Sequence, residues 1–236
     1  LRSFFDYYTG IGEMKRNPAA RVSTPKIHTK EIIQLDPDEV EILLSGIENG
    51  SDKISKHQKK YLDKTRLRDL AITTLLLGTG IRISECVGLD IQDVNFKDNS
   101  IKITRKGGNE QIVFFNSEVQ YVLEDYLHEQ RLNLIPEKGA EDALFLSLKN
   151  NRISVDAIEK MIVKFARMYV PHKRITPHKL RSTFGTQLYQ ETGDLYLVAE
   201  TLGHSSVDTS KKYASMKERK RLVAQTIQLR AQNRES

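Results

Sequence analysis

The sequence predicts a mostly α-helical fold with one small antiparallel β-sheet, an α+β class. Only two segments, 100–104 and 111–115, have the alternating or strand-like pattern that is typical of β-strands. Gly107-Gly108 between them suits a hairpin turn, because glycine accepts the positive φ angles of tight turns. The other apolar segments have helical spacing, so helices are expected to form most of the protein.

The first long helix has a clear start signal at Asp36. Asp36 is a good N-cap, Pro37 suits the first turn, and Glu39 stands at the capping-box position. This helix is expected to run to Gly46. The polar, lysine-rich residues 50–64 that follow predict an exposed loop or a short surface helix.

Helices are also expected along most of the remaining chain. Glycines should end two of them, the first before Gly10 and another before Gly78-Thr79-Gly80. The expected helical segments are 1–8, 67–77, 84–89, 117–132, 154–169, 177–192, 195–202, 207–213 and 215–232.

The length of 236 residues allows one large domain plus a fragment of another. Asn17-Pro18 and Thr24-Pro25 frame an expected linker near the amino terminus. The chain begins with Leu1 rather than Met, which suggests a piece of a longer protein.

Composition excludes several classes of protein. Cys86 is the only cysteine, so an intrachain disulfide and a cysteine-rich zinc site are both excluded. No apolar run approaches the ~20 residues of a membrane span, and the start lacks signal-peptide order. A cytoplasmic location is expected. The 37 Lys and Arg against 31 Asp and Glu give a net charge of +6, which is compatible with a polyanionic partner.

Three charged residues could bind an anion. His178 and Arg181 share a face near the start of an expected helix, where the helix dipole favours negative charge. The alternative is a solvated basic face. Arg82 follows a glycine-rich helix end, where it could pair with Glu85 or bind a phosphate bidentately. Both possibilities stay open from these residues alone.

Three further residues have an ordinary explanation when each is taken singly. Lys106 precedes the Gly107-Gly108 turn and reads as a solvated turn lysine. His204 lies at a helix end, where it could satisfy backbone groups. Tyr213 lies near a helix end, where a tyrosine usually packs against its neighbours.

The order of these residues carries more information than any one of them. Arg82 with Glu85, Lys106, His178 with Arg181, His204 and Tyr213 occur in the segments GTGIRISECVGLDIQDV, RKGGNEQIV, TPHKLRSTFGTQLYQETGD and VAETLGHSSVDTSKKYA. This series resembles the catalytic signature of the tyrosine recombinase, or phage integrase, family. The likeness extends over nearly the whole chain, in the style of Xer-like recombinases and integrases of bacterial mobile elements. One departure is Ser182, where many relatives carry a second histidine.

The resemblance implies the DNA breaking-rejoining catalytic fold of tyrosine recombinases and a domain plan. Residues 1–25 would be the end of a core-binding domain and a linker, and residues 26–214 the catalytic domain. Residues 215–236 would form a C-terminal helix that docks on a neighbouring subunit. The alternative for this helix is packing on its own domain.

The resemblance also implies a role for each signature residue. Tyr213 would attack a DNA phosphodiester and form a 3′-phosphotyrosine link, while Arg82 and Arg181 would hold the non-bridging oxygens. Lys106 would protonate the leaving 5′ oxygen. The remaining residues would accept or donate a proton (His178), hydrogen-bond the phosphate (His204) and support Arg82 (Glu85).

No metal or other cofactor is expected. The carboxylates show no pairing of the kind that holds Mg²⁺, and no Gly-rich Walker loop for ATP is present. The expected partners are double-stranded DNA and other copies of the chain, as a tetramer on DNA and a monomer in free solution, with no membrane. Candidate DNA contacts are Arg105, Lys173, Arg174, Lys179, Lys211 and Lys212.

Two other functions remain as alternatives. A type IB topoisomerase-like enzyme would use the same active site to relax DNA. A DNA-binding protein without catalysis would need only the basic residues.

Overall fold

The structure is a computed structural model that describes residues 1–22, 33–50, 56–105, 107–203, 221–227 and 229, with backbone alone for 56–61. The chain divides into two compact units, Leu1–Ile32 and Ile33–Ser236. Each unit is described by itself. The expected helix at 207–213 lies outside the described residues.

The smaller unit is one helix followed by a turn. Helix α1 (Arg2–Gly10) confirms the helix expected at 1–8, and the 3₁₀ helix η1 (Pro18–Arg21) begins at the Asn17-Pro18 signal. The Asn17 side chain caps η1 and donates to Asp6 Oδ1 at 2.6 Å. None of the residues of α1 is buried.

Helix α3 (Lys56–Thr79) is the central helix of the larger unit, and α2 (Pro37–Asn49), α5 (Ser117–Asp125), α6 (Val155–Tyr169) and α7 (Pro177–Thr192) contact it. Its second half is deeply buried, with Ile72, Leu75 and Leu77 fully shielded from solvent. Such a helix can bury apolar surface on all sides because other helices surround it.

The start of α3 corrects the expectation for residues 50–64. Residues 56–64 belong to this helix rather than to a loop or to a separate surface helix. Lys and Gln are good helix formers, and buried Leu62 and Thr65 give the polar segment an inner face. The sequence pattern missed this extension because few apolar residues mark it.

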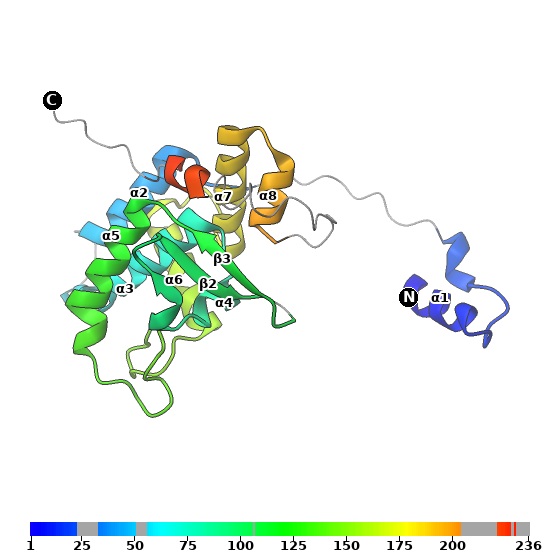
Figure 1. Ribbon diagram of the computed structural model, residues 1–236, viewed down its shortest axis with the longest axis horizontal. Helices are drawn as coiled ribbons and strands as arrows, with labels where there is room; N and C mark the ends of the chain where they lie inside the picture. Colours follow the sequence, from blue (N-terminus) through cyan, green and yellow to red (C-terminus); the bar gives the residue numbers. More distant parts are fainter. Residues whose placement is uncertain (23–32, 51–55, 106, 204–220, 228, 230–236) are drawn as a thin grey trace. The chain divides into compact units, whose positions relative to one another are not determined.

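The expected hairpin is confirmed, and it belongs to a three-stranded antiparallel sheet in the order β1-β2-β3 (Figure 1). Strand β2 (Ser100–Thr104) pairs with β3 (Glu110–Phe114), and Ile101 faces Val113. Gly107 and Gly108 both have positive φ, at 93° and 84°. Strand β1 (Val94–Asn95) was not expected, because two residues are too few to show an alternating pattern.

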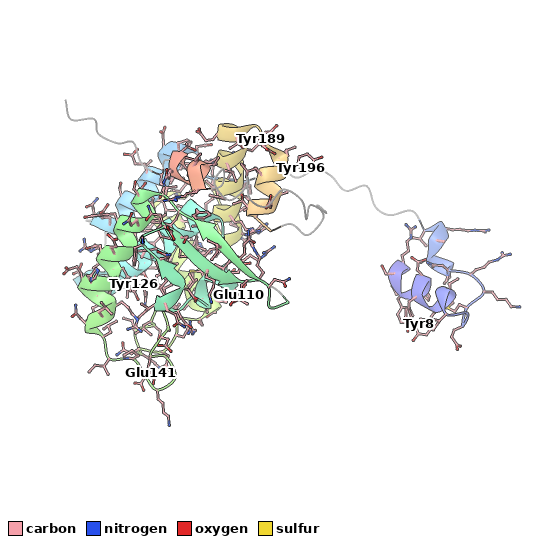
Figure 2. All side chains as sticks on the ribbon, viewed as in Figure 1. Tyr8, Glu110, Tyr126, Glu141, Tyr189 and Tyr196 are labelled. Carbon is pink, nitrogen blue, oxygen red and sulfur yellow. The ribbon has the colours of Figure 1, made fainter. Side chains whose placement is uncertain are left out.

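The other helices lie close to their expected positions. These are α4 (Ile83–Val87) and α8 (Leu195–Thr201), and α5 continues through a π turn at Tyr126–Gln130 and a 3₁₀ turn at Arg131–Asn133. A further 3₁₀ turn, η2, spans Ile91–Asp93. In Figure 2, Tyr189 on α7 and Tyr196 on α8 point outward, and they are 44% and 69% exposed.

The described part of the C-terminal segment packs on its own unit. Residues 221–226 are helical, and Ile227 and Leu229 are buried. Asn116 joins this segment to α5, because its Nδ2 donates to Ile227 O at 2.6 Å while its Oδ1 accepts from Val119 N at 2.9 Å. Docking of the C-terminal helix on a neighbouring subunit stays a prediction.

Substitution of Asn116 should separate its two contacts. Asn116→Ser keeps an N-cap but cannot reach Ile227, whereas Asn116→Ala loses both contacts and should lower the free energy of unfolding by a further ~1 kcal/mol. Both variants should be cut faster by trypsin after Arg221. Denaturation and limited proteolysis measure the two effects. Equal cleavage rates for Asn116→Ser and the unaltered chain would show that this bond does not hold the segment.

Candidate active site

Gly80 lets two distant segments meet. It ends α3 with a φ of 63°, and a Cβ at this position would stand 2.3 Å from Phe184 Cδ1. Only glycine fits such a conformation at such a close approach. The carbonyl of Gly80 consequently lies within reach of α7, where Arg181 Nη1 donates to it at 2.5 Å.

Glu85 is a buried carboxylate that binds two guanidinium groups. Its side chain is 3% exposed. Oε2 accepts from the backbone N of Arg82 at 2.7 Å, which caps the start of α4, and Oε1 accepts from Arg82 Nη1 at 2.9 Å. Oε1 also lies 3.2 Å from Arg105 Nη1. The ion pair expected as one possibility for Arg82 is therefore present, and 41% of that side chain remains exposed.

Arg105 lies inside the site, beside Glu85. Its side chain is only 10% exposed. Nε donates to Gln111 Oε1 at 2.7 Å, Nη2 to Thr201 O at 3.0 Å and Nη1 to Leu202 O at 3.2 Å. Each guanidinium nitrogen of Arg105 thus donates within the protein, and its contact with DNA phosphates stays a prediction.

Arg181 is the third arginine of the site. It is 7% exposed, and its Nη2 donates to Leu202 O, the same carbonyl that Arg105 binds. We call Arg82, Glu85, Arg105 and Arg181 the arginine cluster. Its members come from the α3–α4 junction, the base of the β2–β3 hairpin, and α7.

The arginine cluster has more positive than negative charge among the residues that the structure describes, with three guanidinium groups around one carboxylate. Burial, together with the charges of Arg82 and Arg105, lowers the pKa of Arg181 from 12.5 to about 10, although Glu85 acts in the opposite direction. Burial also lowers the pKa of Arg105. Arg181 stays protonated at neutral pH, but its charge is costly, and a bound oxyanion would offset that cost.

His178 lies one turn before Arg181 on α7. The two residues differ in environment, because His178 is exposed while Arg181 is buried. The expectation that both side chains point at one anion stays a prediction.

Five of the expected residues lie outside the described part of the chain, namely Lys106, His204, Lys211, Lys212 and Tyr213. Two of these are next to described residues of the site in the chain. Lys106 follows Arg105 directly, and His204 comes two residues after Leu202, whose carbonyl binds Arg105 and Arg181.

The expected DNA contacts on α7 and its preceding loop divide into two kinds. Lys173 Nζ lies 2.8 Å from Asp36 Oδ2 and 2.6 Å from Glu39 Oε2, and these hydrogen bonds raise its pKa. Lys173 thus stabilises the start of α2, and its contact with DNA stays a prediction. Arg174 is exposed and Lys179 half-buried, and neither side chain has a hydrogen-bond or ion-pair partner among the described residues.

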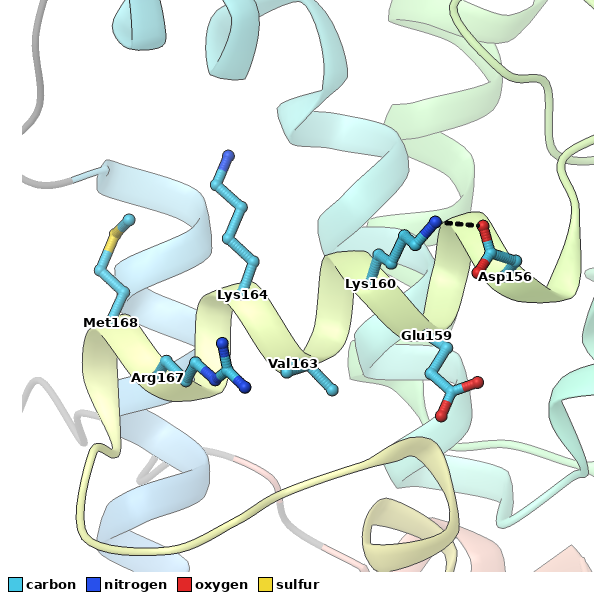
Figure 3. A pocket seen from close by; sticks show the side chains of 7 residues that line it. All are labelled: Asp156, Glu159, Lys160, Val163, Lys164, Arg167 and Met168. Atoms are coloured by element: carbon cyan, nitrogen blue, oxygen red, sulfur yellow. Dashed lines mark hydrogen bonds and ion pairs between the residues drawn. The ribbon is translucent and has the colours of Figure 1, made fainter.

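A large open cavity of about 720 Å³ lies along α6 and does not coincide with the arginine cluster (Figure 3). Its charged lining is mixed, and Lys160 pairs with Asp156 at 2.7 Å. It contains none of the residues singled out from the sequence. The buried cations of the arginine cluster are the better candidate for chemistry, because perturbed pKa values concentrate at functional sites.

The described residues form neither a candidate metal site nor a candidate membrane span. They hold no group of three His, Cys, Asp or Glu side chains that could bind a metal ion. None of their helices has both the length and the apolar character to cross a membrane.

Gly203 is expected to tolerate no side chain. Its φ is 65°, and a Cβ there would stand 2.5 Å from Arg105 Cζ. Gly203→Ala should therefore cost more stability than Gly193→Ala, since Gly193 has a similar φ of 62° but an empty surrounding. A left-handed alanine alone costs about 1–2 kcal/mol. Thermal denaturation measures both variants, and equal losses would contradict the close packing of Arg105 on Gly203.

Comparison with known proteins agrees with this fold. The model of the phage integrase family matches residues 34–220. Tyrosine recombinase XerC of Vibrio cholerae is 32% identical over 216 residues, which cover 92% of this chain and 64% of that protein. Tyrosine recombinase XerS of Streptococcus agalactiae is 35% identical over 232 residues, covering 90% and 64%. The chain thus spans slightly less than two thirds of these curated relatives.

Solved structures share the fold. XerH site-specific recombinase, bound to its palindromic difH substrate after cleavage, is 26% identical with a TM-score of 0.65, and the match covers 79% of this chain and 51% of that one. XerA recombinase is 24% identical with a TM-score of 0.64, covering 94% and 68%. The larger unit, which is mostly helical with a small antiparallel sheet, therefore has the catalytic fold of tyrosine recombinases. The chain belongs to the phage integrase family.

Proposed function

We propose that this chain is the catalytic part of a site-specific tyrosine recombinase, which cleaves and rejoins DNA through a covalent link to Tyr213. The arginine cluster is the observation that carries the proposal. Arg82 and Arg181 lie far apart in sequence, yet they gather around Glu85 and the Leu202 carbonyl in a chain of the phage integrase family.

Arg82 and Arg181 would bind the non-bridging oxygens of one phosphodiester. Guanidinium groups suit this task because they are always charged and can donate two parallel hydrogen bonds. In the transition state the phosphoryl oxygens gain negative charge, and fixed cations in a water-poor site stabilise that charge strongly. The partial exposure of Arg82 leaves it accessible to a ligand.

Bond exchange would proceed by two matched transesterifications. The phenol oxygen of Tyr213 attacks phosphorus and passes its proton to His178, while the bond from phosphorus to the 5′ oxygen breaks. Lys106 donates the proton that the leaving 5′ oxygen needs, and His204 donates a hydrogen bond to the phosphate. A 5′ hydroxyl of another strand then reverses the step. The phosphotyrosine conserves the bond energy, so no step uses ATP.

The proposed domain plan assigns residues 26–214 to catalysis, residues 1–25 to the end of a core-binding domain with its linker, and 215–236 to subunit contact. The proposed partners are double-stranded DNA and further copies of the chain, assembled as a tetramer on DNA. XerH recombinase was solved with its difH substrate, which supports a DNA partner here. Arg174 and Lys179 remain the described candidates for contact with DNA phosphates.

A phosphate-like anion should bind the arginine cluster. Inorganic phosphate should raise the melting temperature of the unaltered protein more than chloride of equal ionic strength, because the anion offsets buried positive charge. At a phosphate concentration ten times the dissociation constant, binding should raise the free energy of unfolding by about 1.4 kcal/mol. Arg82→Gln should lose this difference, whereas Arg152→Gln, outside the cluster, should keep it. A phosphate effect that is unchanged in Arg82→Gln would contradict the site.

Tyr213→Phe should abolish the covalent intermediate, because a benzyl side chain has no nucleophilic oxygen. The full-length protein is incubated with sheared genomic DNA of its own organism, and covalent adducts are captured under denaturing conditions. Captured sequences then supply nicked suicide duplexes for rate measurements. Tyr196→Phe, which alters an exposed tyrosine on α8, is the matched control and should form the adduct normally.

The outcomes of this experiment separate the candidate functions. An adduct that persists in Tyr213→Phe would show that another residue is the nucleophile. Site-independent relaxation of plasmid DNA by a monomer would indicate a topoisomerase-like enzyme instead. Salt-sensitive DNA binding without any adduct would indicate a DNA-binding protein that lacks catalysis.

A further inference from the structure

Every guanidinium nitrogen of Arg105 donates a hydrogen bond, and the acceptors come from three separate segments. Nε binds Gln111 on β3, across the hairpin that Arg105 itself begins. Nη1 binds Glu85 on α4. Both Nη atoms also reach the end of α8 and its following residue, through the carbonyls of Thr201 and Leu202.

The end of α8 is well suited to hold a cation. The last carbonyls of a helix lack partners within the helix and carry the negative end of its dipole. Arg105 satisfies two such carbonyls, and the left-handed glycine at 203 leaves the space that its guanidinium fills. Lysine could not replace these contacts, since a single ammonium lacks the planar fork that spans several acceptors.

Through its place in the chain and its contacts, Arg105 is connected to three proposed catalytic residues. Lys106 is joined to Arg105 by a peptide bond, and His204 follows the Leu202-Gly203 turn that Arg105 binds. Arg82 shares the carboxylate of Glu85 with Arg105. Arg105 is the last described residue before Lys106 in the hairpin, and its side chain is held at both the hairpin and the end of α8.

We propose that Arg105 is a positioning residue, which holds the base of the β2–β3 hairpin and the Leu202-Gly203 turn against the Arg82–Glu85 pair. Lys106 and His204 directly follow these described residues in the chain. This inference rests on the proposed function, because it concerns the same active site. It assigns Arg105 no contact with DNA. Arg105 would affect the reaction by positioning the proposed general acid Lys106, because a misplacement of ~1 Å can cost about 10²-fold in rate.

The test compares two suicide substrates in full-length Arg105→Met. The first has an ordinary phosphodiester at the cleaved position, and the second has sulfur in place of the 5′-bridging oxygen. A thiolate leaves without protonation, because thiol pKa values lie near ~8.5. With saturating DNA, Arg105→Met should cleave the ordinary substrate about 10²-fold more slowly. It should cleave the sulfur substrate at close to the unaltered rate.

Arg152→Met is the matched control, because Arg152 makes comparable contacts elsewhere. Its Nη1 donates to Val87 O and Leu89 O at 3.0 and 2.9 Å, and its Nη2 lies 2.5 Å from Asp90 Oδ1. Arg152→Met should leave both cleavage rates unchanged. Arg105→Lys keeps the charge without the fork, so it should remain impaired on the ordinary substrate.

Hydrogen–deuterium exchange without DNA gives a readout that does not depend on catalysis. Arg105→Met should speed exchange in peptides that cover 105–110 and 198–204, and Arg152→Met should not. If Arg105→Met does not fold, Gln111→Met, which removes only the hairpin acceptor, should show the same changes in smaller size. Unchanged exchange in both segments would overturn the proposal.

Three kinetic results would also overturn it. Equal slowing on both substrates would show a general loss of structure. Full activity of Arg105→Lys would show that charge alone matters. Weaker DNA binding, with the slope of log binding constant against log salt concentration reduced by about one, would show a direct phosphate contact. An unaltered chain that forms no adduct would contradict the proposed function instead, and the exchange measurement would still decide whether Arg105 joins the two segments.

Discussion

The buried carboxylate of Glu85 is the interaction on which the site depends. Removing a guanidinium from water costs several kcal/mol unless an opposite charge and hydrogen bonds replace the lost solvent. Glu85 supplies that charge to Arg82 and Arg105 while its second oxygen caps α4. One side chain therefore fixes both the start of a helix and the orientation of two cations, and it moderates the charge around Arg181.

The fold was predictable wherever local chemistry marks an element. The Asp36-Pro37 start, the Gly107-Gly108 hairpin and the long amphipathic helices follow from capping, turn geometry and apolar spacing. The polar first part of α3 and the two-residue strand β1 were missed, because neither has an apolar pattern of sufficient length. Tertiary packing decides such segments.

The sequence indicated some of the residues that the arginine cluster contains, but not which basic residues make internal contacts. Motif order indicated Arg82, Glu85 and Arg181, and the structure brings these together. The sequence assigned Arg105 and Lys173 to DNA, whereas the fold engages them with internal acceptors. Whether a basic side chain faces solvent or a carboxylate distant in sequence depends on tertiary structure, so charge in a motif cannot settle it. Gly203 gives a local indication of the packing of Arg105, because a glycine after a helix permits another side chain to approach the backbone closely.

The net positive charge of the chain is consequently a poor guide to the proposed DNA-binding surface. Arg105 and Lys173 add to the charge but make internal contacts. Arg174, on the loop before α7, is exposed, and Lys179, near the start of α7, is half-buried. Unlike Arg105 and Lys173, these two side chains make no internal ion pair or hydrogen bond among the described residues.

The anchors of Arg181 are main-chain oxygens, those of Gly80 and Leu202. A peptide carbonyl is present whatever side chain its residue bears, so these acceptors survive most substitutions that preserve the local backbone. At these two positions the contact with Arg181 therefore depends on backbone shape rather than on side-chain chemistry. A main-chain anchor of this kind is compatible with many different surrounding sequences, provided that the two turns keep their course.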